Sequence, residues 1–288
     1  MPKSISANFR FGTVGSPQST PKKPGGSVGA VQQTAALGLS ALELGWVQSV
    51  RVSEETCDAI QTAAKDQNVA LSVHAPYFIN LNADAEEWPK SKKRLMDAAY
   101  YGWLAGATDI IFHPGSYFNQ PADQIMPLVI ERLQSCVEET LARGVEVRFR
   151  PETMGKSAMI GSLEDTLEMS RRIPNVLPCL DFAHLHARPG DGSVNTYDEW
   201  MDILQAYAQA LGPDSLHHLH IHLSGIEYSA KGERNHLPLR ESDLDLEGLF
   251  TALKTVSAGG RILCESPVME EDALYMQQLW ASKTTPKP

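Results

Sequence analysis

Eight short runs rich in β-branched and aromatic residues recur along the chain, and amphipathic stretches of helical length separate each pair. Runs of this kind, bounded by Gly, Pro, Asn or Asp, are typical of buried strands. The predicted strands cover residues 8–13, 41–46, 70–75, 109–114, 145–152, 176–182, 218–223 and 261–266. A strand–helix alternation that closes at eight units predicts an α/β protein with a (β/α)8 TIM barrel fold.

The alternation fills almost the whole chain and leaves no linker or low-complexity tract that would separate two domains. A length of 288 residues is within the range of one such barrel. Local signals agree with the predicted helices, since Ser162 with Asp165 resembles a capping box. We therefore predict a single domain over residues 1–288, with a frayed tail at 283–288.

Composition narrows the functional classes. The N-terminus has no apolar signal region and no apolar run is long enough to span a bilayer, so we expect a soluble, cytoplasmic protein without membrane contact. The four cysteines form no CxxC pair, which favours buried free thiols over a disulfide framework or a thiolate zinc site. A net charge of -10 disfavours general attraction of nucleic acid, so a polyanion would need a local basic patch or metal ions.

Metal-ligating residue types stand at the C-terminal ends of six successive predicted strands. They are His74, His113, Glu152, Asp181, His222 and Glu265. In a (β/α)8 barrel these ends share one face, where active sites are built. Three further candidates, His184, Glu233 and His236, follow in the loops. Imidazoles and carboxylates together suit Zn²⁺, Mn²⁺ or Fe²⁺, and nine candidates exceed the needs of one tetrahedral ion, so we predict two or three metals.

The run LHHLHIHLS at residues 216–224 holds four of the chain's nine histidines. In an extended strand His218, His220 and His222 point to one face, and only His222 reaches the C-terminal end. We therefore expect His222 to be a ligand. His217, His218 and His220 are expected to fill the barrel or to form local hydrogen bonds.

Two arginines conflict with this simple picture of the barrel. By the same alternation, Arg148 and Arg150 share a face with Glu152. Bulky aliphatic side chains dominate the interior of such barrels, so two arginines there are unexpected. A β-bulge near Pro151 would move them, and we expect one at that position.

Six motifs occur in a familiar order and spacing: SVHAPYFINL, IIFHPGS, RPETMGK, CLDFAHLHA, HIHLSGIEYSAKGERNH and LCESP. They resemble the endonuclease IV family of type II apurinic/apyrimidinic endonucleases, within the xylose-isomerase-like TIM barrels, from the third predicted strand to the eighth. The resemblance implies a trinuclear zinc cluster. It also implies a substrate, double-stranded DNA with an abasic site, whose backbone is cleaved 5′ to the lesion to leave a 3′-hydroxyl.

The resemblance assigns roles by position. His74 and His113 would hold the first zinc ion, and Glu152 would bridge it to the second. The second site would be completed by Asp181, His222 and Glu265, and the third would include His184 and His236. Catalytic roles are implied for Glu152 and Glu265, and Tyr77 would bind the DNA substrate at the lesion.

The chain departs from the family pattern at the third site. The family has Asp-x-His in the loop after the seventh strand, whereas this chain has GERNH. Arg234 stands two residues before His236 and cannot bind zinc, because its guanidinium stays protonated and has no acceptor. Glu233, one residue further back on this loop, is the carboxylate expected to replace the aspartate.

Clustered divalent ions suit phosphodiester hydrolysis because they can activate water and take the charge on the leaving oxygen. No Ser, Cys or Lys stands in triad-like company with a His and a carboxylate. Basic residues after the first, third and seventh strands are expected to form a phosphate-facing rim. They are Lys22, Lys23, Lys90, Lys92, Lys93, Arg94, Lys231 and Arg234.

Two other classes stay open. Sugar isomerases and epimerases of the xylose-isomerase-like barrels bind one or two divalent ions through two Glu, an Asp and a His, and Glu152, Asp181, His222 and Glu265 satisfy that pattern. That interpretation gives no role to four other histidines at the same mouth, which favours the nuclease. They are His74, His113, His184 and His236. A metal-dependent binding module without activity is the third class, and activity after zinc reconstitution would distinguish it.

Overall fold

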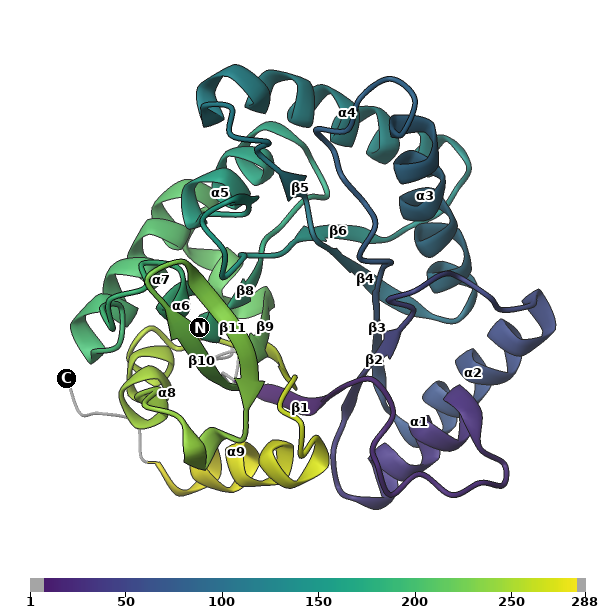
Figure 1. Cartoon of the computed structure of the whole chain (residues 1–288). Helices are drawn as coiled ribbons and strands as arrows, with labels where there is room; N and C mark the ends of the chain where they lie inside the picture. The colour runs from purple at the N-terminus through teal and green to yellow at the C-terminus, as the bar shows by residue number, and fades with distance from the viewer. Residues whose placement is uncertain (1–7, 284–288) are drawn as a thin grey trace, which may run out of the picture.

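Eight parallel strands form one sheet in the computed structural model, which describes residues 8–283 (Figure 1). They are β1 (Phe9–Val14), β2 (Ala41–Gly45), β3 (Ala70–His74), β4 (Ala107–Phe112), β6 (Arg148–Pro151), β8 (Cys179–Asp181), β9 (Leu219–Leu223) and β12 (Gly260–Cys264). The order is β6-β4-β3-β2-β1-β12-β9-β8, and parallel bridges Phe149–Val176 and Glu152–Cys179 join the two outer strands. The predicted (β/α)8 barrel is confirmed, while the tail predicted at 283–288 lies outside the described residues apart from Lys283.

Helices follow the strands and surround the barrel (Figure 1). The α-helices are α1 (Gly26–Ala36), α2 (Glu54–Gln67), α3 (Trp88–Leu104), α4 (Ala122–Ala142), α5 (Leu163–Arg172), α6 (Phe182–Ala187), α7 (Tyr197–Leu211), α8 (Leu246–Thr255) and α9 (Glu270–Ser282). Two 3₁₀ helices are η1 (Pro213–His218) and η2 (Leu239–Glu241). Ser162 and Asp165 form the expected capping box of α5. Within residues 8–283, no helix is long and apolar enough to cross a membrane.

Two small antiparallel sheets lie at the ends of barrel strands. β5 (Gly115–Ser116) pairs with β7 (Met159–Ile160), and β10 (Gly225–Ser229) pairs with β11 (Gly232–Leu237). Figure 1 shows the β10–β11 hairpin crossing in front of β9. The segment with Glu233 and His236 is thus a strand rather than the expected loop, because Gly232 adopts φ 91° and allows a tight turn.

Most of the hydrophobic core lies in two large clusters that differ in sequence range. The first contains residues between positions 30 and 176, with Val73 and Phe149 fully buried. The second joins β1 to residues 163–280, with Trp200 and Phe250 fully buried. Outward-facing strand residues and inward-facing helix residues supply both clusters, which leaves the inside of the barrel to other side chains.

The interior of the barrel toward the N-terminal strand ends is charged. Arg148 and Arg150 lie opposite Asp109 and Ile111 in a continuous β4–β6 register, so the bulge expected near Pro151 is wrong. Instead, Asp109 Oδ1 accepts hydrogen bonds from Nε of Arg148 at 3.1 Å and Nε of Arg150 at 2.7 Å. Burial raises the pKa of Asp109, but the charges of Arg150 and Arg261 outweigh it and hold that pKa well below its usual value.

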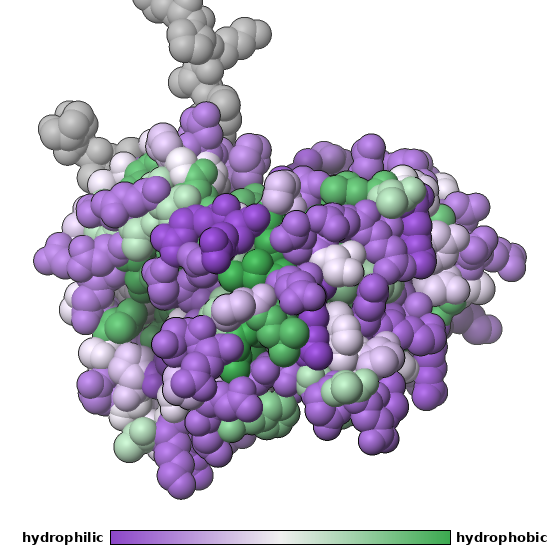
Figure 2. Space-filling model, turned by 90° about the horizontal axis from the view of Figure 1, so that it is seen from above, coloured by the Kyte–Doolittle hydropathy of each residue, from purple (hydrophilic) through white to green (hydrophobic). Residues whose placement is uncertain are grey.

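The outer surface is mainly hydrophilic. Figure 2 shows polar residues over most of one side, with hydrophobic residues gathered in a narrow hollow between its two halves. On α3, Lys92 pairs with Glu139 at 2.8 Å and Lys93 with Asp97 at 2.6 Å. Several cations expected at a phosphate-facing rim are therefore already neutralised by carboxylates.

Candidate metal centre

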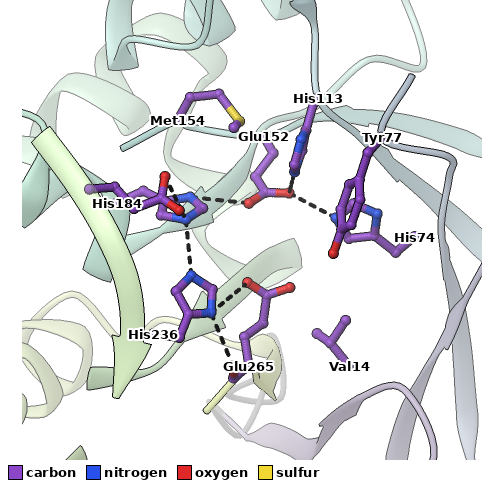
Figure 3. Close-up of a pocket in the computed structure, with 10 residues that line it drawn as sticks. Val14, His74, Tyr77, His113, Glu152, Met154, His184, His236 and Glu265 are labelled. Carbon is purple, nitrogen blue, oxygen red and sulfur yellow. Dashed lines mark hydrogen bonds and ion pairs between the residues drawn. The ribbon is translucent and has the colours of Figure 1, made fainter. Parts of the chain in front are cut away.

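A pocket of ≈ 360 Å³ opens at the mouth of the barrel (Figure 3). Seven of the nine predicted ligands line it: His74, His113, Glu152, His184, Glu233, His236 and Glu265. The other two, Asp181 and His222, are fully buried beside them. Tyr77, Val14 and Met154 complete the lining. The structure thus brings all nine residues together from seven separate segments of the chain.

Glu152 occupies the centre of this cluster, directly after β6. Its Oε2 atom lies 3.2 Å from Nε2 of His74 and 3.4 Å from Nε2 of His113. Its Oε1 atom lies 3.2 Å from Nδ1 of His184. Burial raises the pKa of Glu152, but His113, His184 and His222 lower it by more than burial raises it. The pKa of Glu152 is therefore held well below its usual value. One ionised carboxylate therefore faces histidines on two sides.

Asp181, His222 and Glu265 form a second group with Glu152, with one ligand atom of each within 4.8 Å of the others. His222 Nδ1 lies 3.4 Å from Glu265 Oε1. Three buried atoms here have no hydrogen-bond partner in the part of the chain that the structure describes: Oε1 of Glu152, Oδ2 of Asp181 and Nδ1 of His222. Buried polar atoms are ordinarily satisfied, so three converging orphans fit a cation as their common partner.

Asp181 differs from its neighbours in protonation. Burial and the nearby charges of Glu265 and Glu152 outweigh the effect of His184 and raise the pKa of Asp181 to about 6. The pKa of His184 is raised well above its usual value, because Asp181 and Glu152 outweigh the opposing effect of burial. The cluster thus competes for protons when no other cation neutralises its carboxylates.

His184 and His236 form a third group, in which one ligand atom of each lies within 4.8 Å of the other and of Asp181, and Glu233 stands beside it. The Nε2 atoms of the two histidines lie 3.2 Å apart, and Glu233 Oε2 lies 3.6 Å from Nε2 of His184. The Nδ1 atoms point elsewhere, to the backbone carbonyls of Thr153 at 3.0 Å and Glu265 at 3.1 Å. Because a carbonyl only accepts, each Nδ1 carries a proton, and in the neutral imidazoles that bind a metal the two Nε2 lone pairs face each other beside a carboxylate. That donor set fits a metal ion.

A β-bulge explains why Glu233 reaches this group. Ile226 pairs with His236 and Tyr228 pairs with Glu233, which leaves Arg234 as one extra residue on β11. Residues three apart normally point to opposite faces of a strand, but the extra residue returns Glu233 to the face of His236. Arg234 itself pairs with Glu227 at 3.0 Å. The chain thus brings a carboxylate to the third group by a different spacing.

Gly155 makes room for Glu233. A Cβ atom at position 155 would lie 2.6 Å from Glu233 Cβ and 3.1 Å from His184 Cδ2, closer than side-chain atoms approach. The Gly155 carbonyl also accepts the Glu233 backbone N–H at 3.0 Å. The glycine of RPETMGK and the glutamate of GERNH are therefore one structural unit.

Tyr77 stands at the rim of the pocket, with 47% of its surface exposed. Its ring stacks on His113, with centroids 5.0 Å apart and planes inclined by 23°. Burial raises the pKa of Tyr77 to about 12, with Glu265 and Glu152 adding to the effect. Tyr77 is therefore a neutral phenol that supports a candidate ligand on one side and faces solvent on the other.

The structure also reveals polar residues that sequence reasoning did not select. Glu43 of β2 is fully buried, and its Oε2 accepts hydrogen bonds from Ser72 Oγ at 2.7 Å and His220 Nε2 at 2.9 Å. The available signal was a glutamate inside the otherwise apolar run ALELG. His220 fills the barrel as expected, whereas His218 ends η1 and is exposed.

Cys179 lies close to His220 and His222, and these three could also hold an ion. All three are fully buried. Burial raises the pKa of the Cys179 thiol well above its usual value, so it is protonated and a poor ligand. The grouping at the mouth has the better donors.

A closed (β/α)8 barrel with imidazoles and carboxylates converging at the C-terminal strand ends defines a barrel protein with a side-chain cluster able to hold metal ions. The chain belongs to the xylose isomerase-like TIM barrel family, whose profile matches residues 31–283. An uncharacterised protein of Methanocaldococcus jannaschii is 35% identical over 271 residues, which cover 94% of this chain and 96% of that protein.

Endonuclease relatives confirm the resemblance noted from the motifs. Endonuclease 4 of Thermus thermophilus is 27% identical, covering 68% of this chain and 71% of the relative. A probable endonuclease 4 of Oceanobacillus iheyensis is 28% identical, and the match spans 55% of its length. Among solved structures, endonuclease IV of Thermus thermophilus aligns with a TM-score of 0.74 at 21% identity, over 95% and 98% of the two chains. A D-tagatose 3-epimerase-like protein aligns with a TM-score of 0.68 at 17% identity, over 95% and 96%.

Proposed function

We propose that this protein is a metal-dependent DNA repair endonuclease that hydrolyses the phosphodiester 5′ to abasic sites in double-stranded DNA and leaves a 3′-hydroxyl. The third group, His184, His236 and Glu233, carries the proposal. It adds donors to the two Glu, Asp and His that a sugar isomerase would use, since His184 and His236 group with Asp181 within 4.8 Å and Glu233 Oε2 lies 3.6 Å from Nε2 of His184. The endonuclease 4 relatives support the same activity.

Zn²⁺ is the expected ion, with Mn²⁺ or Fe²⁺ as alternatives, and two or three ions fit the ligands. His74, His113 and Glu152 would hold the first, while Asp181, His222 and Glu265 would join Glu152 at the second. His184, His236 and Glu233 would hold the third. Bound together, such ions supply Lewis acidity and lower the pKa of water.

The chain's own residues would do the remaining work. Glu152 and Glu265 would supply two negative charges within one ligand group, where they orient the histidines and can accept protons from water. The side chain of Glu265 is 10% exposed, so it is the better placed of the two to exchange protons with solvent. Tyr77 would pack against the DNA at the lesion, and its half-exposed ring, stacked on His113, supports this role.

The direct test is incubation of the zinc-reconstituted protein with a duplex oligonucleotide that contains one abasic site, with and without chelator. We expect incision 5′ to the lesion, a product that a polymerase extends, and loss of both with chelator. Glu152→Ala should remove more metal and activity than His236→Ala, because Glu152 contacts two groups and His236 only one. Metal-loaded protein that leaves the duplex intact would contradict the proposal.

The runner-up is a divalent-metal-dependent sugar isomerase or epimerase. It is favoured by the grouping of Glu152, Asp181, His222 and Glu265 and by the epimerase-like fold relative. Interconversion of ketoses or aldoses without any incision would support it. His184→Ala separates the two, since it should impair the nuclease strongly and an isomerase only weakly.

A further inference from the structure

His222 is held differently from the other candidate ligands. The Nδ1 atoms of His74, His184 and His236 each donate to a backbone carbonyl, at 2.9, 3.0 and 3.1 Å respectively, and their Nε2 atoms face the cluster. In His222 the arrangement is reversed, since Nδ1 faces Glu265 and Glu152 at 3.4 and 3.7 Å. Its Nε2 atom lies 3.0 Å from Oε1 of Glu43.

Glu43 reaches His222 across the inside of the barrel. β2 and β9 are separated in the sheet by β1 and β12, so this contact depends on side chains rather than on strand pairing. Both residues are fully buried, so the contact is shielded from bulk solvent. A buried carboxylate next to an imidazole nitrogen favours a proton on that nitrogen.

The Glu43 carboxylate is fixed by other neighbours. Its Oε2 atom accepts hydrogen bonds from Ser72 on the adjacent strand β3 and from His220 on β9. Oε1 has no hydrogen-bond partner of good geometry among the described residues, and Nε2 of His222 is its near neighbour. Oε2 is thus satisfied by two donors, while Oε1 is left for His222.

We propose that Glu43 is a positioning residue for the metal centre. It keeps the proton of His222 on Nε2, so that the lone pair of Nδ1 is free to bind a metal ion together with Glu152, Asp181 and Glu265. A carboxylate behind a ligating imidazole fixes ring orientation and strengthens the nitrogen as a donor. Glu43 would therefore set the metal affinity of the second group without touching the ion. This inference rests on the metal binding of the proposed function and not on the substrate.

The first experiment measures zinc affinity by competition with a chromophoric chelator. Glu43→Gln keeps the shape of the side chain but replaces the carboxylate by an amide, which cannot accept from Ser72, His220 and His222 together. Zinc at the second group should therefore bind about 10- to 100-fold more weakly. Ser72→Ala is the matched control, because it removes a donor to Oε2 and leaves Oε1 beside His222. Its zinc affinity should stay close to that of the unaltered protein.

Two outcomes would overturn the inference. One is unaltered zinc affinity in Glu43→Gln, and the other is an equal loss in Ser72→Ala, which would mean that any damage to this part of the barrel weakens metal binding. Circular dichroism of each variant without metal verifies folding.

A second measurement needs no variant to fold. Long-range proton–nitrogen spectra of ¹⁵N-histidine-labelled, zinc-loaded protein report which ring nitrogen carries the proton. We expect His222 as the Nε2–H form; an Nδ1–H form would refute the role of Glu43. Neither the zinc affinity nor the tautomer of His222 depends on DNA cleavage. A protein without nuclease activity could still show the role of Glu43, and a nuclease could lack it.

Discussion

At the scale of single residues, the cluster contains two buried carboxylates whose pKa values shift in opposite directions. Glu152 has several histidine partners and is held ionised, whereas the pKa of Asp181 is raised to about 6. Asp181 Oδ2 has no hydrogen-bond partner within the described chain, and the His184 charge nearby does not outweigh the effect of burial. Protons and metal ions therefore compete for Asp181 near neutral pH.

This competition predicts a pH-dependent stabilisation by zinc. Because the pKa of folded Asp181, about 6, exceeds the ordinary value of 3.8, protonation of Asp181 stabilises the metal-free fold at low pH, and that contribution is lost as pH rises through about 6. Zinc needs the carboxylate, so its stabilising effect should grow from about pH 5 to about pH 7.5. Thermal melts with and without zinc measure it; an equal shift at both pH values would argue against the assignment.

The charged interior gives a second prediction. Asp109→Ala would leave Arg148, Arg150 and Arg261 without their shared carboxylate and should lower the free energy of unfolding by about 3–5 kcal/mol. Arg148→Gln is the control and should cost less, since the Arg148 side chain is 36% exposed and can be solvated. Urea denaturation compares the two. Similar losses would show that the cluster is stabilised by something other than Asp109.

The limit of sequence reasoning is visible in these residues. His222 and Glu265 could be selected because each stands at the end of a predicted strand, a position that needs no tertiary information. Glu43 could not, since its partners lie on β3 and β9 and the contact exists only after the barrel closes. Arg148 and Arg150 were placed on the correct face, but their counter-ion Asp109 is 39 and 41 positions away in the sequence.

At the scale of elements, the eight barrel strands were predictable because each is a short apolar run between turn signals. The β10–β11 hairpin was not, since GIEYS and GERNHL are rich in polar residues and only half-buried. Its strands are defined by pairing with each other and by the contact of Glu233 with Gly155. Sequence therefore identified Glu233 and His236 but not the bulge that brings them together.

The bulge predicts an unusual tolerance to deletion. Removing Arg234 should restore a regular ladder with Glu233 and His236 two residues apart and still on one face, so the third ion should be retained. Removing both Arg234 and Asn235 makes Glu233 and His236 neighbours on opposite faces, and about one ion should be lost. Elemental analysis of the two deletion variants gives the answer. Equal metal content in both would contradict the bulge interpretation.

At the scale of the whole molecule, an acidic protein is proposed to bind an acidic polymer. Lys92 and Lys93 already pair with carboxylates, whereas Lys22 and Lys23 lie in the loop after β1. Replacing Lys22 and Lys23 by Gln should reduce the salt dependence of binding to an uncleavable abasic duplex by a slope of up to about 1.8. The same change at Lys92 and Lys93 should leave the slope unaltered. Fluorescence anisotropy at several salt concentrations measures it, and equal slopes would refute this division of the rim.

The division of the core into two hydrophobic clusters bears on how the chain becomes ordered during synthesis. The first cluster uses residues between positions 30 and 176, so it can pack before the rest has left the ribosome. The second needs β1 to pair with β12, and residues near both ends of the chain must meet. Closure of the barrel is thus the late, long-range event. The ligands of the first group, His74, His113 and Glu152, all lie within the sequence range of the first cluster, whereas the second and third groups need His222, His236 and Glu265 and are completed only at that last step.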